Sequence, residues 1–151
     1  MTPSELEIVD VAPHDDRMLC DALPVLQELR PHLTPESFSA IYQEGYTQGL
    51  RFTVAYRNEE CVGVAGWRVL ATTVAGRKLS VDDLVTAGSG RSRGVGRALL
   101  AALLQRADQA GCTILDLDSA VHRFDAHRFY MREAMAITAH HFTKRVGSPG
   151  P

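Results

Sequence analysis

The sequence has 151 residues and contains no long apolar run, no strong excess of either charge and only three cysteines. No apolar stretch approaches the roughly 20 residues that a membrane-spanning helix needs. The net charge of −2 argues against nucleic acid as the main partner, because domains that bind nucleic acid are usually basic. The sequence therefore predicts neither a membrane protein nor a nucleic-acid-binding protein.

The three cysteines, Cys20, Cys61 and Cys112, are widely spaced and form no Cys-x-x-Cys pair. An odd number at such spacing argues against a disulfide framework and indicates reduced thiols, as in a cytosol. Residues 1–10 also lack the basic start and the apolar run of a signal peptide. A cytoplasmic protein is therefore expected.

Length and composition are those of one globular domain. Hydrophobic residues make up 45% of the chain and charged residues 23%, which is ordinary for a folded protein. We find no internal repeat and no linker, and the Gly- and Pro-rich end is expected to be a flexible tail. The sequence therefore predicts a single domain over residues 1–146, followed by a tail over residues 147–151.

Hydrophobic periodicity predicts a mixed α/β (α+β) fold. A strand, a long helix and a strand around residues 79–119 imply one central parallel pair in an otherwise antiparallel sheet that is flanked by helices. The expected elements are a strand at 6–11, a helix over 18–33 with a break at Pro24, a helix over 35–48, strands at 52–56, 61–70 and 79–86, a helix that ends at Gly111, a strand at 113–119, a helix at 126–132 and a strand at 137–146.

The stretch RSRGVGRA, residues 91–98, lies between a predicted strand and a predicted helix. Gly94 and Gly96 permit positive φ and have no Cβ, so backbone N–H groups can gather around an anion. The following helix directs its unpaired N–H groups to the same place. Arginine side chains add full positive charges, and together these features predict a site for a diphosphate.

Four interpretations compete for this loop. A P-loop requires Lys followed by Ser or Thr, but Arg97 and Ala98 stand there. A Rossmann fingerprint requires a third glycine where Leu99 stands, and no strand-borne acid follows at the expected distance. A glycine-rich turn with solvated arginines is the third. The fourth is the pyrophosphate loop of the GNAT family of N-acetyltransferases, [Gln/Arg]-x-x-Gly-x-[Gly/Ala], which the loop resembles through Arg91, Gly94 and Gly96.

A second segment, VHRFDAHRFYMREAM over residues 121–135, resembles the same family. The family commonly carries Asn-x-x-Ala-x-x-[Phe/Leu]-Tyr there; Ala126, Phe129 and Tyr130 match, while Arg123 replaces Asn. The family's following Gly-Phe appears here as Ala134-Met135. The order of elements is also similar, so the resemblance covers essentially the whole chain. Residues 117–144 further resemble the aminoalkylphosphonate N-acetyltransferases.

The resemblance implies acetyl-CoA as co-substrate, with no metal expected. It also implies that Tyr130 faces the thiol and protonates it as it leaves. The fourth strand of the family holds the acetyl thioester through backbone N–H groups, and the glycine-rich loop holds the diphosphate. The implied cofactor-binding residues are Leu84, Val85, Thr86, Arg91, Ser92, Arg93, Gly94, Val95, Gly96, Arg97 and Ala98.

Asp83 is the candidate general base. Strand alternation places it with Leu79, Val81 and Val85 on a largely apolar face, where burial raises the pKa of a carboxylate. Asp82, on the other face, is the alternative, and a bulge of one residue would exchange the two faces. A purely structural carboxylate is a further alternative.

These observations predict an acetyl-CoA-dependent N-acetyltransferase that acts on a primary amine of a small molecule by direct attack in a ternary complex. An amine of a protein or peptide, and a regulatory module that binds coenzyme A without turnover, are the alternatives. A homodimer is possible. His122, Asp125 and His127 do not share one helical face, which favours solvated or capping roles over a metal site. Trp67 and Tyr56 are expected in the core.

Overall fold

The computed structural model describes residues 5–88 and 94–147. The chain divides into two compact units, Met1–Leu117 and Asp118–Pro151. Unit 1 contains a five-stranded sheet whose spatial order follows the chain order. Its strands are antiparallel neighbours except for the last pair, which is parallel, so the predicted fold class is confirmed. The strands are β1 (Glu7–Val11), β2 (Arg51–Arg57), β3 (Glu60–Thr72), β4 (Gly76–Thr86) and β5 (Ile114–Leu117).

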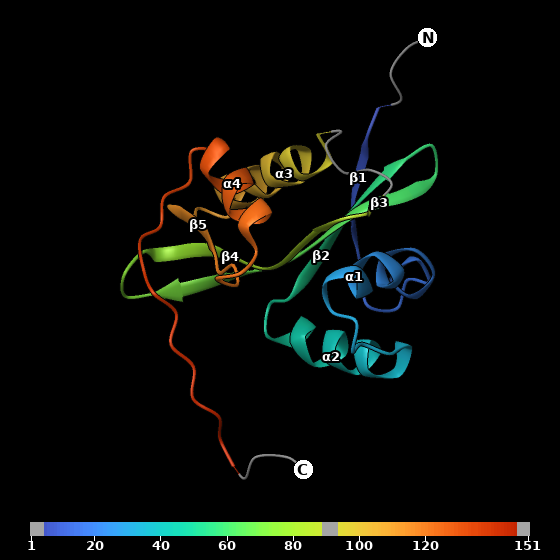
Figure 1. The fold of residues 1–151 in the computed structure, drawn as a ribbon. Helices are drawn as coiled ribbons and strands as arrows, with labels where there is room; N and C mark the ends of the chain where they lie inside the picture. Colours follow the sequence, from blue (N-terminus) through green and yellow to red (C-terminus); the bar gives the residue numbers. More distant parts are fainter. Residues whose placement is uncertain (1–4, 89–93, 148–151) are drawn as a thin grey trace. The chain divides into compact units, whose positions relative to one another are not determined.

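Helices cover both faces of this sheet. Figure 1 shows α1 and α2 on one face and α3 on the other. In unit 2 one helix, α4 (Phe124–Arg132), follows β5 in the sequence. The helical elements of unit 1 are the π-helical turn η1 (Met18–Ala22), α1 (Leu23–Leu29), α2 (Pro35–Thr47) and α3 (Val95–Gln109).

Pro24 explains why the first helix changes its form. A proline inside an α-helix lacks the N–H that would bond the carbonyl four residues earlier, and its ring collides with that carbonyl. The chain approaches Pro24 through η1, where the Leu23 N–H bonds the Met18 carbonyl across five residues. Pro24 then stands at the start of α1. The expected break is therefore a π-helical turn before the proline.

The core of unit 1 has two layers, one on each face of the sheet. Gly63 permits the close approach of α3, because a Cβ there would lie 2.8 Å from both Leu99 Cδ1 and Val95 Cγ1. The layer under α1 and α2 includes Met18, Leu26, Phe38, Tyr42, Phe52, Val54, Val64, Val85 and Ala87. The layer under α3 includes Trp67, Leu79, Val81, Val95, Leu99 and Leu103.

The strand predicted over residues 137–146 is absent. The segment carries no regular secondary structure, and Ile137, Phe142 and Val146 are 75%, 90% and 100% exposed. An alternating pattern predicts a strand only where a neighbouring strand supplies hydrogen bonds and an apolar surface. The prediction from residue pattern was therefore wrong for this segment, whose β-prone residues have no such partner within the described parts of the chain.

Candidate active site

β4 and β5 separate within the sheet. Their parallel pairing runs from Lys78 to Val81 on β4 and ends at the Val81–Leu117 pair. Among the residues that the structure describes, no strand continues along that edge of β4 beyond Val81. The remaining part of β4, which ends at Thr86, therefore has an open edge.

The open edge of β4 presents backbone groups of alternate residues. The Ala87 N–H donates to the Val62 carbonyl on the opposite side, at 2.8 Å. Because successive residues of a strand direct their N–H and C=O groups to opposite edges, those of Thr86 and Leu84 face the side that β5 has left. The backbone groups of Val85 face β3. Of the three residues predicted to hold the thioester, Leu84 and Thr86 are thus the ones suited to do so.

A β-bulge at Asp82 lies where the two strands part. Gly66 of β3 pairs with Asp83, but the next residue, Trp67, pairs with Val81, which leaves Asp82 as an extra residue. The bulge exchanges the faces of β4. Leu79 and Val81 before the bulge therefore pack under α3, whereas Val85 after it packs under α1 and α2.

Asp83 lies on the face of α1 and α2. A Cβ on Gly66 would lie 3.2 Å from Asp83 Oδ2 and 2.8 Å from Phe52 Cε1, so glycine at position 66 relieves crowding between Asp83 and the Phe52 ring. Strand alternation correctly grouped Asp83 with Val85. It wrongly grouped Asp83 with Leu79 and Val81, because the bulge falls between them.

The Asp83 carboxylate is mostly buried and is paired. Its side chain is 16% exposed, and Arg30 Nε, just after α1, donates to Asp83 Oδ1 at 2.9 Å. Burial raises the pKa of Asp83 above its ordinary value, while the hydrogen bond and charge of Arg30 act in the opposite direction. Asp82 is more exposed, at 38%, and its Oδ2 accepts from Arg68 Nε at 2.7 Å. Asp83 is therefore the better placed of the two as a base.

The start of α3 can receive an anion. Gly94 has φ +79° and precedes the helix without giving it a side-chain cap, so the N–H groups of the first turn have no such partner. A Cβ at Gly94 would meet nothing within 4 Å, so glycine serves here for its backbone conformation. Val95 is 1% exposed and packs in the core, which leaves only its backbone for a ligand.

The predicted loop residues are placed in part. Gly94, Val95, Gly96, Arg97 and Ala98 stand at the beginning of α3. Arg91, Ser92 and Arg93 lie outside the described residues. The diphosphate role of the whole loop stays a prediction.

Tyr130 lies in α4 of unit 2 and is partly buried. Burial raises the pKa of its phenol above the ordinary value, and the charge of Arg123 acts against this. Its ring meets that of Phe129 at a centroid distance of 5.4 Å. The phenol therefore keeps its proton at neutral pH, as a general acid must. That Tyr130 acts on a thiol held by unit 1 stays a prediction.

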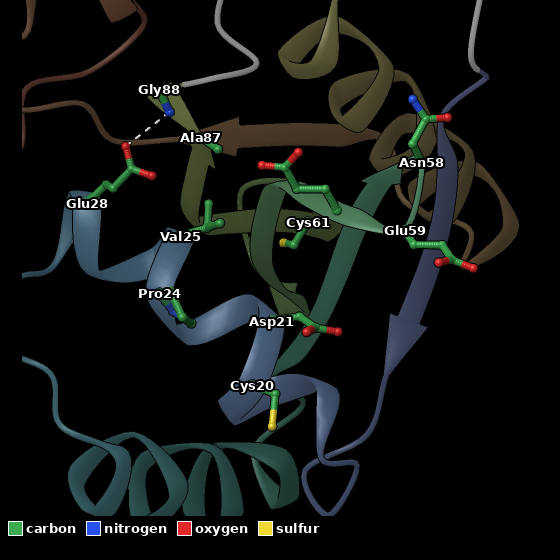
Figure 2. Close-up of a pocket in the computed structure, with 11 residues that line it drawn as sticks. Cys20, Asp21, Pro24, Val25, Glu28, Asn58, Glu59, Cys61, Ala87 and Gly88 are labelled. Atoms are coloured by element: carbon green, nitrogen blue, oxygen red, sulfur yellow. Dashed lines mark hydrogen bonds between the residues drawn. The ribbon is translucent and has the colours of Figure 1, made fainter.

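A cavity of about 680 Å³ opens beside the end of β4 (Figure 2). Four acids line it, and among the residues that the structure describes its lining contains neither Lys nor Arg. The Glu28 carboxylate accepts from the Gly88 N–H at 3.1 Å. Sequence reasoning missed this cavity because Asp21, Glu28, Glu59 and Glu60 come from separate segments that only the fold brings together.

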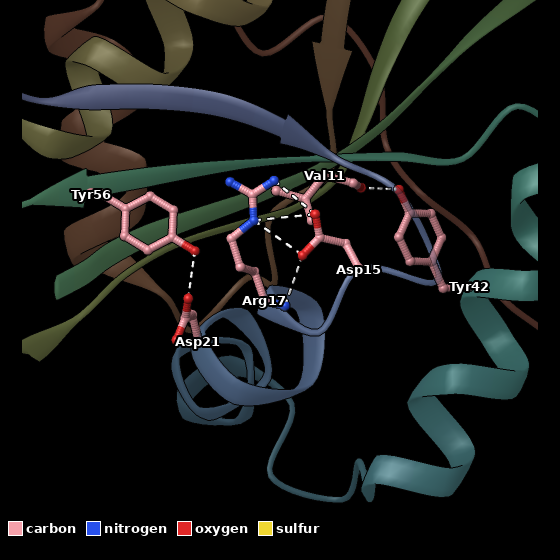
Figure 3. Close-up of polar contacts among 6 residues, drawn as sticks. All are labelled: Val11, Asp15, Arg17, Asp21, Tyr42 and Tyr56. Atoms are coloured by element: carbon pink, nitrogen blue, oxygen red, sulfur yellow. Dashed lines mark hydrogen bonds and ion pairs between the residues drawn. The ribbon is translucent and has the colours of Figure 1, made fainter. Parts of the chain in front are cut away.

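Hydrogen bonds fix η1 and its surroundings (Figure 3). The Tyr56 hydroxyl donates to Asp21 Oδ2 at 2.7 Å, and the buried Tyr42 hydroxyl donates to the Val11 carbonyl at 2.6 Å. Burial raises the pKa of Tyr42 to about 12. Tyr56 and Trp67 are 8% and 9% exposed, so their predicted place in the core is confirmed.

Several other acids and histidines have polar partners. Asp116 accepts from Lys78 Nζ at 2.7 Å, and His141 Nδ1 lies 3.3 Å from Asp118. His127 Nε2 lies 2.8 Å from the Ala120 carbonyl. Within residues 5–88 and 94–147, no group of three or more His, Cys, Asp or Glu is arranged to hold a metal. No helix in these ranges is long and apolar enough to cross a membrane.

Comparisons with known proteins agree on one family. The family model described as "Acetyltransferase (GNAT) family" matches residues 17–134. An uncharacterized N-acetyltransferase, YhdJ of Bacillus subtilis (strain 168), is 30% identical over 132 residues, which cover 83% of this chain and 90% of that protein. The aminoalkylphosphonate N-acetyltransferase of Salmonella typhimurium (strain LT2) is 29% identical over 148 residues, covering 83% and 95%.

A solved structure shares the fold. The aminoglycoside N-acetyltransferase AAC(6')-Iy, in complex with CoA, superposes with a TM-score of 0.83 at 17% identity, over 95% of each chain. The relatives match across most of this chain, and not only across its C-terminal half.

Proposed function

Because the chain belongs to the acetyltransferase (GNAT) family and is an N-acetyltransferase with acetyl-CoA as co-substrate, we propose that it acetylates the primary amine of a small molecule by direct attack in a ternary complex. The observation that carries the proposal is the open edge of β4. Leu84 and Thr86 direct backbone groups to that edge, and the strand leads toward the start of α3. Acetyl-CoA needs both features: backbone groups that hold its thioester, and a helix start nearby that binds its diphosphate.

Each proposed residue acts in one step of the acetyl transfer. N–H groups of Leu84 or Thr86 hold and polarise the acetyl carbonyl. Asp83 removes a proton from the acceptor ammonium, through a water where its short side chain does not reach. The acceptor nitrogen then bonds to the carbonyl carbon as the carbon–sulfur bond breaks, and Tyr130 protonates the departing thiolate. The second proton that the nitrogen must lose to become an amide passes through solvent and restores the Tyr130 phenol. The loop residues Arg91–Ala98 bind the diphosphate.

Two features set this proposal apart from the alternatives. A coenzyme A-binding module without turnover needs no buried carboxylate beside the open edge, yet Asp83 is there. No cysteine lies on β4 or α3, which supports direct transfer over an acetyl-cysteine intermediate.

Acetylation of a protein or peptide amine is the second candidate. We place the enzyme in the cytoplasm, where its free cysteines remain reduced.

Release of free thiol from acetyl-CoA across a panel of acceptors tests this function. The panel contains simple amines, aminophosphonates, amino acids, polyamines and peptides. We expect steady thiol release with at least one small amine and much less with peptides. Release with peptides alone would favour the second candidate, and no release with any acceptor would favour the binding module.

Gly94→Val tests the diphosphate site. Saturating acetyl-CoA should raise the Tm of the wild type, because a ligand at 100 times its Kd stabilises the folded state by about 2.7 kcal/mol. Gly94→Val should remove most of that increase, since valine strongly disfavours φ +79° and would reshape the start of α3. Differential scanning fluorimetry with and without acetyl-CoA measures both values.

Gly76→Val is the matched control. Gly76 has φ +74°, and a Cβ placed on it would meet nothing within 4 Å, but it lies at the opposite end of β4. The substitution should lower the Tm of the free protein comparably and keep the increase with acetyl-CoA. Equal loss of the increase in both variants, or equal stabilisation of the wild type by NAD, would contradict the assignment.

A further inference from the structure

Four charged side chains form two ion pairs beside the β4 bulge. Arg30 pairs with Asp83 at 2.9 Å, and Arg68 of β3 pairs with Asp82 at 2.7 Å. The two arginines balance the two carboxylates. This arrangement suits a ligand that carries both a positive and a negative group better than it suits a polycation.

Arg30 has donors to spare. A guanidinium has five N–H donors; Nε bonds Asp83 Oδ1, and Nη2 bonds the Asp82 carbonyl at 3.4 Å. Its other donors have no partner within the described ranges, residues 5–88 and 94–147. The Arg30 side chain is 45% exposed, while that of Asp83 is 16% exposed. The carboxylate is therefore the inner member of the pair, and the guanidinium faces the outside.

We propose that Arg30 determines acceptor specificity: it binds a carboxylate or phosphonate of a short amine whose ammonium group faces Asp83. The inference rests on the proposed function, and it narrows the acceptor to a small zwitterion. A planar guanidinium matches the oxygens of either anion in a bidentate manner. Because Arg30 bonds Asp83 directly, the two charges of the acceptor must be only a few bonds apart.

A purely structural role for Arg30 explains less. α1 is already anchored through Leu23, Val25 and Leu26, which are at most 6% exposed. A pair with one exposed partner adds little to such an anchor. A role in α1 docking alone would also not explain why the remaining N–H groups of Arg30 face away from Asp83.

Matched acceptor pairs test the inference in the full chain. Each pair contains an amine with an anionic group and an uncharged counterpart: glycine with glycinamide, and 2-aminoethylphosphonate with ethylamine. The readout is the ratio of kcat/KM within each pair. Both members need the same base, so an effect of a variant on Asp83 largely cancels in the ratio. The two pairs distinguish a carboxylate from a phosphonate acceptor.

In the wild type we expect at least one ratio to favour the anionic acceptor by about 10- to 100-fold, the range for hydrogen bonds to charged groups. Arg30→Gln should bring that ratio close to one, mainly by raising KM for the anionic member. Arg30→Lys keeps the positive charge but lacks the planar guanidinium that can bind two oxygens at once. It should lower the ratio by a smaller factor than Arg30→Gln does. Methylphosphonate or acetate should compete with the amine in the wild type.

Arg68→Gln is the matched control, because it removes one positive charge from the same four residues without contacting Asp83. It should change the ratio by less than about threefold, the effect of a screened charge at a distance. If Arg68→Gln lowers the kcat/KM ratio as much as Arg30→Gln does, the preference arises from the overall positive charge and not from a specific contact with Arg30. That result would overturn the inference. So would a wild-type ratio near one, a preference for polyamines, or an unchanged ratio in Arg30→Gln.

Failures of the two proposals differ. If the wild type acetylates no amine, the proposed function itself is wrong. If it acetylates amines without preferring an anionic one, only the role of Arg30 is wrong. If Arg30→Gln does not fold, two other results test the role of Arg30 without that variant. These are the kcat/KM ratio of Arg30→Lys and the competition by methylphosphonate or acetate in the wild type.

Discussion

Asp83→Asn is expected to lower kcat by about 10²- to 10⁴-fold, the usual contribution of a general base. Asparagine keeps the size of the side chain and its place beside Gly66 but cannot accept the ammonium proton. The Kd for acetyl-CoA should change little, because the diphosphate is proposed to bind at the start of α3 and not at Asp83. Steady-state kinetics and calorimetric titration measure the two quantities.

The pH dependence gives an independent readout on Asp83. A base works when deprotonated, so kcat/KM should fall as pH falls through its pKa. Burial raises the pKa of Asp83 above the ordinary 3.8, so this acidic limb should lie above that of a solvated aspartate. The acceptor ammonium contributes to the same limb, so two amines of different pKa must be compared. The limb that remains fixed between the two amines should vanish in Asp83→Asn.

Stability should change with pH in a defined direction. Since the folded-state pKa of Asp83 is raised, its contribution to stability is fully present below the unfolded-state pKa and is lost as pH rises through the folded-state pKa. The Tm of Asp83→Asn relative to that of the wild type should therefore increase with pH across this range. A constant difference would indicate that Asp83 titrates normally.

Asp82→Asn is the control for the assignment of the base. Asp82 is the extra residue of the bulge, and its partner is Arg68. It should reduce kcat much less than Asp83→Asn does. The reverse order would make Asp82 the base and leave Asp83 as a structural carboxylate in its pair with Arg30.

Local signals in the sequence were sufficient for most elements. Thr34 accepts from the Ser37 N–H at 3.1 Å and caps α2, which begins at residue 35 as predicted. Gly111, with φ +74°, ends α3. Each of these signals acts within a few residues, so the sequence alone contains the information.

Features that depend on a distant partner were less predictable. One inserted residue decides which face of β4 carries Asp83, and only its register against Gly66 and Trp67 places the bulge. The end of β5 at Leu117 fixes where the open edge begins, although the residue pattern favoured a strand to position 119. The Arg30–Asp83 pair joins residues 53 positions apart, so no local pattern indicates it.

Tyr130→Phe should lower kcat by about 10²- to 10⁴-fold if the phenol protonates the departing thiolate. The substitution keeps the ring and its contact with Phe129, and the Tyr130 hydroxyl has no hydrogen-bond partner among the described residues. The Tm should therefore remain close to that of the wild type. The Kd for acetyl-CoA should also change little. Kinetics, thermal unfolding and titration on one preparation separate these effects.

Two other tyrosines serve as controls for Tyr130. Tyr46 is 39% exposed on α2, and Tyr46→Phe should leave kcat unchanged. Tyr42→Phe removes a buried hydroxyl that donates to the Val11 carbonyl, so it should cost about 1–3 kcal/mol of stability. A loss of kcat in Tyr130→Phe without a Tyr42-like loss of stability would identify a chemical role. A fall in kcat of less than about threefold, far below the range for general acids, would mean that water protonates the thiolate and that Tyr130 only packs in its helix.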